Sequence, residues 1–248
     1  MQTTKWGPEG WKVFHTIPFF YEPEPTPANK RLFKKFFTNL QCVLPCKYCR
    51  ESYKEFIKEI PIDKYLNSSC SLFYWTYLMH NRVNRKLREQ GYLHEKDPTP
   101  EEVFDTYFDR TERDKARPNE EPLWVEPLLL FLGTIVFNYS DKDLDKKEQY
   151  PVFISMIPDL FAAAKQDIRE MDLYKQYIKE NNPKQALTDL DSMKQWYFGL
   201  VSAVKPDLFR SYESYDDFFE SRRAGCSKNT CRKSNPTTTN VRTGTCTL

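Results

Sequence analysis

The chain has 248 residues, with 37 Lys and Arg against 35 Asp and Glu, and a formal net charge of +2. This balance favours no charged partner, so we expect neither nucleic acid nor a membrane to bind. Eighteen Phe, fifteen Tyr and five Trp beside only seven Gly favour an all-α protein over a sheet protein. The N-terminus has no signal-peptide apolar region, and the longest apolar run, 127–137, is too short to span a bilayer; both predict a cytoplasmic protein.

The first region, residues 1–96, has the pattern of a helical bundle. Apolar residues recur at helical spacing in four segments, which are separated by prolines and polar cap residues. The predicted helices follow the turn 7–10, span 30–42, run from Pro45 to just before Pro61, and extend from the caps at 67–69 toward Gly91. Four helices of this length suit a four-helix bundle.

Two cysteines three residues apart, Cys46 and Cys49, lie at the expected start of the third helix, with Pro45 as its first residue. The positive helix N-terminus, together with Lys47 and Arg50, favours thiolate over thiol. In a reducing compartment such a pair is more typical of redox catalysis or metal binding than of a structural disulfide. On spacing alone, the pair could therefore be redox-active or half of a zinc site.

That zinc site would need further ligands, for which Cys42, Cys70 and His80 are the candidates. Otherwise Cys42 and Cys70 are interpreted as buried small hydrophobic residues.

Side chains suited to a planar ring occur on the first and fourth helices. Trp11 and His15 are four residues apart and share one face, and His80 and Asn84 repeat that spacing. A bundle can point both faces at the CxxC helix, which would bring together flat rings, the two amides of Asn81 and Asn84, and a dithiol. Such a set suits a hydrogen-bonding, redox-active ring.

Three segments resemble the Erv/ALR family of flavin-dependent sulfhydryl oxidases. Residues 6–16, with Trp11 and His15, resemble its WxxxH helix, residues 45–49 its PCxxC, and residues 80–87 its HNxVNxxL. The order of the motifs is that of the family, and the combination is most similar to virus-encoded members with an added helical region. Two alternatives, a zinc-stabilised helical interaction protein and a flavin-free CxxC thiol–disulfide oxidoreductase, need no HNxVN segment.

The resemblance implies FAD at the mouth of the bundle and an enzyme that forms disulfides in protein substrates. Electrons would pass from dithiols through Cys46 and Cys49 and FAD to molecular oxygen, which gives hydrogen peroxide. Cys46 would exchange with incoming thiols and Cys49 would lie against the isoalloxazine ring. A homodimer is implied as well, and the viral members suggest a cytoplasmic assembly site or the virion. The implied flavin contacts are Gly7, Trp11, His15, Cys49, His80, Asn81, Val83, Asn84 and Lys86.

The chain departs from the family pattern in two places. The family's C-x16-C disulfide begins three residues before the HN pair, where this chain has Tyr77 and, at the second position, His94. The later aromatic segment near the adenine is also missing, and Tyr92 is a candidate to replace it.

Beyond the boundary at residues 97–102, the region 97–222 is expected to be a helical accessory domain of unknown role. Thr99 and Glu102 have capping-box spacing. Helices are predicted over 123–138, 157–179 and 183–204, and we identify no internal repeat and no catalytic signature. Residues 223–248 are polar and predict a flexible tail, in which Cys226 and Cys231 are a possible shuttle pair.

Overall fold

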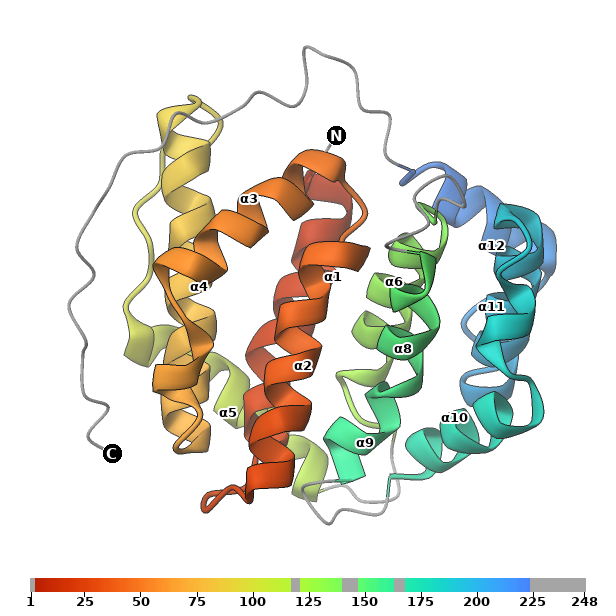
Figure 1. Ribbon diagram of the computed structural model, residues 1–248, viewed down its shortest axis with the longest axis horizontal. Helices are drawn as coiled ribbons and strands as arrows, with labels where there is room; N and C mark the ends of the chain where they lie inside the picture. Colours follow the sequence, from red (N-terminus) through yellow and green to blue (C-terminus); the bar gives the residue numbers. More distant parts are fainter. Residues whose placement is uncertain (1–2, 117–120, 140–146, 163–167, 224–248) are drawn as a thin grey trace.

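The computed structural model describes residues 3–116, 121–139, 147–162 and 168–223, and all regular secondary structure within them is helical. This confirms the predicted all-α class. The elements form two groups that lie side by side, with α1–α5 in one and α6–α12 in the other (Figure 1).

The first group contains the predicted four-helix bundle. Its elements are α1 (Thr3–Thr16), η1 (Ile17–Phe20), α2 (Pro27–Val43), α3 (Lys47–Glu59), η2 (Ile62–Tyr65), α4 (Ser69–Glu89) and α5 (Pro100–Ala116). The expected cap of α4 is confirmed, because Ser68 accepts a hydrogen bond from the backbone N–H of Ser71 at 3.1 Å. Gly91 follows the helix with a φ of 74°, a conformation that glycine adopts easily.

The start of α3 differs from the prediction. The helix begins at Lys47, so Cys46 is its N-cap residue and Pro45 lies outside it. Cys46 has an extended backbone, with φ −105° and ψ 129°, whereas Cys49 lies in the first helical turn. The two cysteines are therefore on the boundary of the helix rather than both inside it.

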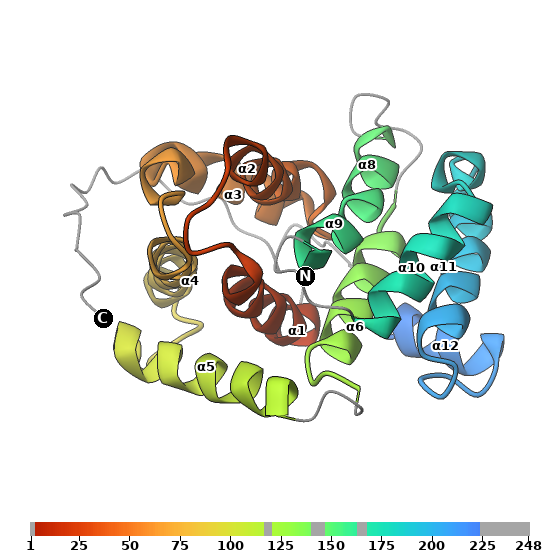
Figure 2. The ribbon, with the colours of Figure 1, turned by 90° about the horizontal axis from the view of Figure 1, so that it is seen from below.

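Helix α5 lies across one side of α1 and α4 (Figure 2). Its capping box is confirmed: Thr99 N–H donates to Glu102 Oε2 at 2.7 Å, and Glu102 N–H donates to Thr99 Oγ1 at 3.2 Å. By packing, α5 belongs with the first group, although the boundary drawn from the sequence falls before it.

The second group differs more from its prediction. Its elements are α6 (Val125–Val136), α8 (Gln149–Ser155), α9 (Ile157–Ala162), α10 (Arg169–Glu180), η3 (Pro183–Ala186), α11 (Leu190–Val204) and α12 (Tyr212–Glu220). The region 157–179 is not one helix, and 183–204 is a 3₁₀ turn followed by a helix. Helices α8 and α12 were not predicted, because neither is long enough to show a clear period.

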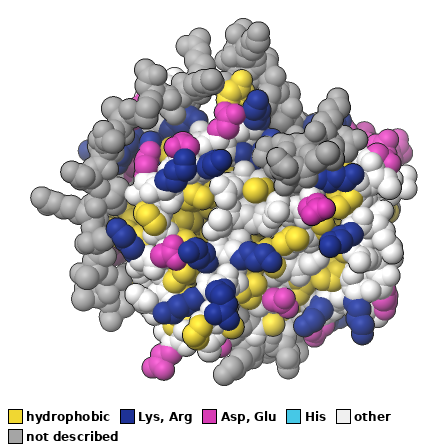
Figure 3. Space-filling model, viewed as in Figure 1, with side chains coloured by type: hydrophobic (Ala, Val, Ile, Leu, Met, Phe, Trp, Pro, Cys, Tyr) yellow, Lys and Arg dark blue, Asp and Glu magenta, His cyan; other side chains and the backbone are white. Residues whose placement is uncertain are grey.

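A continuous apolar core joins the two groups. Helix α1 packs on α6, and α2 packs on α8. None of the helices in the described ranges is long and apolar enough to cross a membrane. On the face in Figure 3, Lys and Arg side chains are scattered among apolar and acidic ones instead of forming one stripe.

Candidate functional site

Three of the predicted flavin contacts meet between α1 and α4. The rings of Trp11 and His80 are stacked, with centroids 3.8 Å apart and planes 11° apart. His15, one turn after Trp11, lies against the same pair, with its ring centroid 6.0 Å from Trp11 and 5.3 Å from His80. The structure thus brings the WxxxH and HNxVN motifs together, as their spacing predicted.

The two histidines form a hydrogen-bonded relay with Thr76, a residue that no sequence pattern indicated. His15 Nδ1 is 3.1 Å from Thr76 Oγ1, and His15 Nε2 is 3.0 Å from His80 Nδ1. The Thr76 hydroxyl donates its only proton to the carbonyl of Phe73 at 2.7 Å, so it can only accept from His15. His15 therefore carries its proton on Nδ1.

Both rings are neutral at physiological pH. Burial, with a smaller effect of His80, lowers the pKa of His15 to about 3. Burial also lowers the pKa of His80 to about 4, against the opposing charge of Asp97. A neutral His15 with its proton on Nδ1 must accept at Nε2, so His80 donates from Nδ1. The Nε2 atom of His80 is consequently a hydrogen-bond acceptor.

The CxxC pair lies at the start of α3. The Cys46 side chain is 1 % exposed, whereas Cys49 is half-buried. Arg50 Nη1 donates to the carbonyl of Leu44 at 2.5 Å and so ties the preceding loop to the first turn of the helix. An incoming thiol can reach Cys46 only if this loop moves.

Two contacts fix the CxxC helix against α4. Arg82 Nε donates to Glu59 Oε2 at 2.7 Å, and Lys86 Nζ donates to Ser52 Oγ at 2.5 Å. Because the later residue of α4 pairs with the earlier residue of α3, the two helices run antiparallel. The turn with Cys49, just before Ser52, is therefore held beside the second half of α4, where the HNxVN motif lies.

The connection from α4 to α5 is held by hydrogen bonds where the family has its disulfide. Asn84 Nδ2 donates to Asp97 Oδ1 at 2.8 Å, and Arg88 forms an ion pair with the same carboxylate. Tyr77, at the position of the first family cysteine, donates from its hydroxyl to the carbonyl of Pro98 at 2.9 Å. Sequence reasoning missed Asp97, because a single acidic residue before a proline carries no specific signal.

An aromatic cover over the histidine relay comes from α5. The ring of Tyr107 is 5.1 Å from that of His15, whereas Tyr92 is 61 % exposed. Phe104 stands beside it and contacts Phe73 of α4 at 5.1 Å. The helical spacing of these residues in 100–116 was the signal that could have identified them.

The remaining predicted contacts lie on the same helices. Asn81 and Val83 are half-buried in α4, and Gly7 is buried in α1. Cys42 is half-buried, and Cys70 is disulfide-bonded, which corrects its interpretation as a small hydrophobic residue. Cys226 and Cys231 lie outside the described residues.

No group of three or more His, Cys, Asp or Glu side chains in the described ranges could hold a metal ion.

These side chains fit the flavin that the family resemblance implies. A Cβ added to the buried Gly7 would meet no atom within 4 Å, so there is space beside α1. Trp11 and His80 offer a flat surface, His80 Nε2 offers an acceptor, and Lys86 offers a cation suited to a phosphate. The site thus combines apolar and aromatic surfaces with a few polar groups, which is the combination that binds a large cofactor.

Sequence comparisons relate the first part of the chain to known proteins. The Erv1 / Alr family profile matches residues 8–104. The chain is 35% identical over 85 residues to a probable FAD-linked sulfhydryl oxidase, R368, of Acanthamoeba polyphaga mimivirus; this covers 34% of the chain and 59% of that protein. It is 31% identical over 85 residues to the FAD-linked sulfhydryl oxidase of African swine fever virus (isolate Pig/Kenya/KEN-50/1950), covering 34% and 70%.

The mitochondrial FAD-linked sulfhydryl oxidase ERV1 of Saccharomyces cerevisiae is 29% identical over 83 residues, covering 34% of this chain and 43% of that protein. The matches thus span from less than half to about 70% of these relatives. No solved structure matches significantly.

Proposed function

The chain belongs to the Erv1/Alr family of FAD-linked sulfhydryl oxidases, and we propose that it forms disulfides in protein substrates with oxygen as the electron acceptor. One observation carries the proposal. The CxxC turn of α3 is fixed by the Ser52–Lys86 contact beside the helix that carries His80 of the aromatic stack. A thiol-exchanging pair and a flat, neutral, hydrogen-bonding surface are thus placed on neighbouring helices.

The bundle would hold FAD between α1 and α4. Trp11 and His80 would contact its rings, Asn84 would offer its amide, and Lys86 would neutralise phosphate charge. Bound FAD supplies the two-electron chemistry, taking electrons from a dithiol and delivering them to oxygen as hydrogen peroxide. The protein supplies position, a water-poor surface and an acceptor at His80 Nε2.

The cysteine pair performs the exchange with substrate. A substrate thiolate attacks one sulfur of the Cys46–Cys49 disulfide, and the other cysteine leaves as thiolate. The second substrate thiolate then attacks the mixed disulfide, so the substrate departs as a disulfide and the pair remains as a dithiol. We assign the attacked sulfur to Cys46, and its burial implies that the loop before it opens first.

Trapping tests this assignment. In Cys49→Ser the Cys46 thiolate can attack the disulfide of a peptide and release one half of it as a thiolate. The mixed disulfide that remains has no neighbouring cysteine to resolve it, so we expect mass spectrometry to find the peptide attached at Cys46. Cys46→Ser should trap little peptide. The reverse pattern would show that Cys49 is the attacked sulfur.

Visible absorption and oxygen consumption test the function itself. The purified protein should be yellow, should consume oxygen when dithiothreitol is added, and should lose this activity in Cys49→Ser. A colourless protein that cannot be reconstituted with FAD would refute the proposal and leave the zinc protein or the flavin-free oxidoreductase as alternatives.

The proposal extends to Cys226 and Cys231 as a shuttle pair between protein substrates and the CxxC. The support is their position in a polar segment after the last described helix. Replacing both with Ser should leave dithiothreitol oxidation unchanged and slow oxidation of a reduced protein. Equal rates with both substrates would contradict the role.

Protein dithiols and oxygen are the partners that this activity implies. The homodimer, the lack of nucleic acid or membrane binding, and the location in the cytoplasm, a viral assembly site or the virion all stay predictions.

A further inference from the structure

The second group of helices repeats the first in sequence order. Tyr53, Lys54, Ile57, Lys58 and Glu59 of α3 recur, each 121 positions later, as Tyr174, Lys175, Ile178, Lys179 and Glu180 of α10. The segment 16–21, TIPFFY, recurs 118 positions later as TIVFNY in 134–139. No internal repeat was expected from the sequence, because these similar stretches are short and the intervening residues differ.

From the end of α3 to the start of α4, the backbone keeps the offset of 121 positions without a gap. Helix α3 ends at Glu59 and α10 at Glu180, η2 begins at Ile62 and η3 at Pro183, and α4 begins at Ser69 and α11 at Leu190. The C-cap residues Ile60 and Asn181 have φ −124° in both cases, with ψ of 75° and 83°. The N-cap residues Ser68 and Asp189 have φ of −158° and −156° and accept from the N–H three residues later. Such agreement indicates one structural unit used twice.

Side-chain hydrogen bonds repeat as well. The indole Nε1 of Trp75 donates to the carbonyl of Ile60, and that of Trp196 to the carbonyl of Asn181, both at 2.9 Å. Two further pairs have the same form, each a tyrosine hydroxyl that donates to a backbone carbonyl. In the first pair, Tyr53 donates to Phe37 at 2.9 Å and Tyr174 donates to Ile154 at 3.1 Å. In the second pair, Tyr21 donates to Leu66 at 2.9 Å and Tyr139 donates to Leu187 at 3.1 Å.

The residues of the flavin site are the ones that the second unit lacks. The equivalents of Trp11, His15, Thr76, His80 and Asn84 are Leu129, Gly133, Tyr197, Val201 and Lys205. The sequence has no cysteine between residues 71 and 225. Glu170 stands at the position of Cys49. This unit can neither exchange thiols nor offer the imidazole relay.

An aromatic side chain fills the space that corresponds to the relay. A Cβ added to Gly133 would lie 2.1 Å from the ring of Phe219 in α12. Phe219 is 1 % exposed and stacks against Phe137, with ring centroids 4.9 Å apart. At the place where the first unit has His15, the second unit is therefore filled by the ring of Phe219. This leaves no room for a cofactor there.

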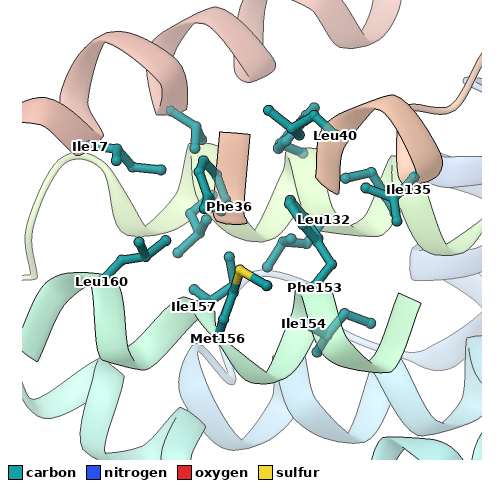
Figure 4. Close-up of a cluster of buried hydrophobic side chains, with 14 of the residues drawn as sticks. Ile17, Phe36, Leu40, Leu132, Ile135, Phe153, Ile154, Met156, Ile157 and Leu160 are labelled. Atoms are coloured by element: carbon teal, nitrogen blue, oxygen red, sulfur yellow. The ribbon is translucent and has the colours of Figure 1, made fainter. Parts of the chain in front are cut away.

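Equivalent elements of the two units contact each other. Helix α1 packs on its equivalent α6, and α2 on its equivalent α8. Phe36 and Phe153, equivalent at an offset of 117, stack with ring centroids 5.1 Å apart, and both are fully buried. Figure 4 shows them in one cluster with the equivalent pairs Ile17 and Ile135, and Leu40 and Ile157. Contact between like surfaces is the property of a two-fold symmetric dimer interface.

We propose that residues 124–220 are a cofactor-free copy of the catalytic unit that covers its α1–α2 face within the same chain, so that the protein acts as a monomer with one flavin. The single flavin rests on the proposed function. The covering of the α1–α2 face and the monomeric state rest on the packing of the two units. Under this proposal, the second unit takes the place that a second subunit would have in the homodimer implied by the resemblance.

Molar mass and flavin content of the full chain test this proposal. Light scattering after size exclusion should give the monomer mass of 29.6 kDa, and denaturation should release one FAD per chain. Twice that mass, or two flavins per chain, would overturn it. A colourless protein would refute the proposed function instead, and the mass would still decide the present proposal.

A substitution in the second unit tests whether it supports the first. Phe153→Ala should lower the temperature of flavin release by about 10 °C, although Phe153 lies outside the flavin site. Phe218→Ala in α12, a half-buried aromatic whose ring contacts lie within the second unit, is the control and should lower it less. Phe153→Leu serves if the alanine variant fails to fold. An unchanged release temperature in a folded Phe153 variant would overturn the proposal.

Discussion

The relay through Thr76 makes a prediction that activity alone would not reveal. Thr76 is fully buried, and its hydroxyl is the acceptor for His15 Nδ1–H. Thr76→Val keeps the shape and removes that acceptor. A buried donor left without a partner costs about 1–3 kcal/mol. For a chain of this size, this corresponds to a fall of roughly 5 °C in the unfolding midpoint.

The same change should reverse the protons along the relay. With no acceptor at Nδ1, His15 is expected to move its proton to Nε2, and His80 must then accept at Nδ1 and carry its own proton on Nε2. The surface offered to a flavin changes from acceptor to donor, so FAD should be retained more weakly.

Nitrogen-15 NMR of the imidazole rings is the direct assay, and only three histidines have to be assigned. The wild type should show His15 and His80 as Nδ1–H tautomers, and Thr76→Val should show both switched. Thr76→Ser, which keeps the hydroxyl, is the control and should leave the tautomers unchanged. The reasoning would be refuted by an Nε2–H tautomer of His15 in the wild type, or by equal effects of valine and serine.

Two further predictions concern pH and the α4–α5 connection. His15 and His80 have folded pKa values of about 3 and 4, below the unfolded value near 6.5, so the unfolded chain binds more protons between these limits. Their contribution to the free energy of unfolding is therefore complete above about pH 7 and is lost as the pH falls from 6.5 toward 3. Denaturant titrations should show that this free energy changes less with pH in His80→Gln, and an equal pH dependence would contradict this. Asp97→Ala leaves Asn84 Nδ2 and Arg88 without their acceptor, so it should weaken FAD binding several-fold, and Asp97→Asn, which keeps one acceptor oxygen, should weaken it less. Equal FAD affinity in all three proteins would exclude a positioning role for this carboxylate.

The sequence was informative where a structural feature depends on nearby residues. The cap at Ser68, the capping box at Thr99 and the shared face of Trp11 and His15 are all determined within one helical turn, and all are confirmed. The meeting of His15 with His80 could be predicted only because a bundle brings two such faces together. Periodicity alone does not specify how two helices are rotated against each other.

Other parts of the site depend on contacts between distant residues, and local patterns do not encode them. Thr76 was not selected, because a threonine within an apolar helix face is ordinary in the absence of the imidazole that it faces. Asp97 and Tyr107 were missed for the same reason, since each acts on a residue of another helix. The short α8 and α12 become recognisable by packing against longer helices rather than by their own period.

A comparison of the two units distinguishes contacts that maintain the fold, which occur in both, from contacts that serve the chemistry, which occur only in the first. The paired bonds of Trp75 and Trp196 both satisfy a carbonyl at the C-terminal end of a helix, where backbone acceptors lack helical partners. This need is the same in both units, so the bonds occur in both. The relay of His15 and His80 satisfies no such backbone group, and in the second unit glycine and valine replace them at no cost in backbone hydrogen bonding. The fold does not require a buried pair of imidazoles. Their presence in the first unit is best explained by a ligand that binds to them.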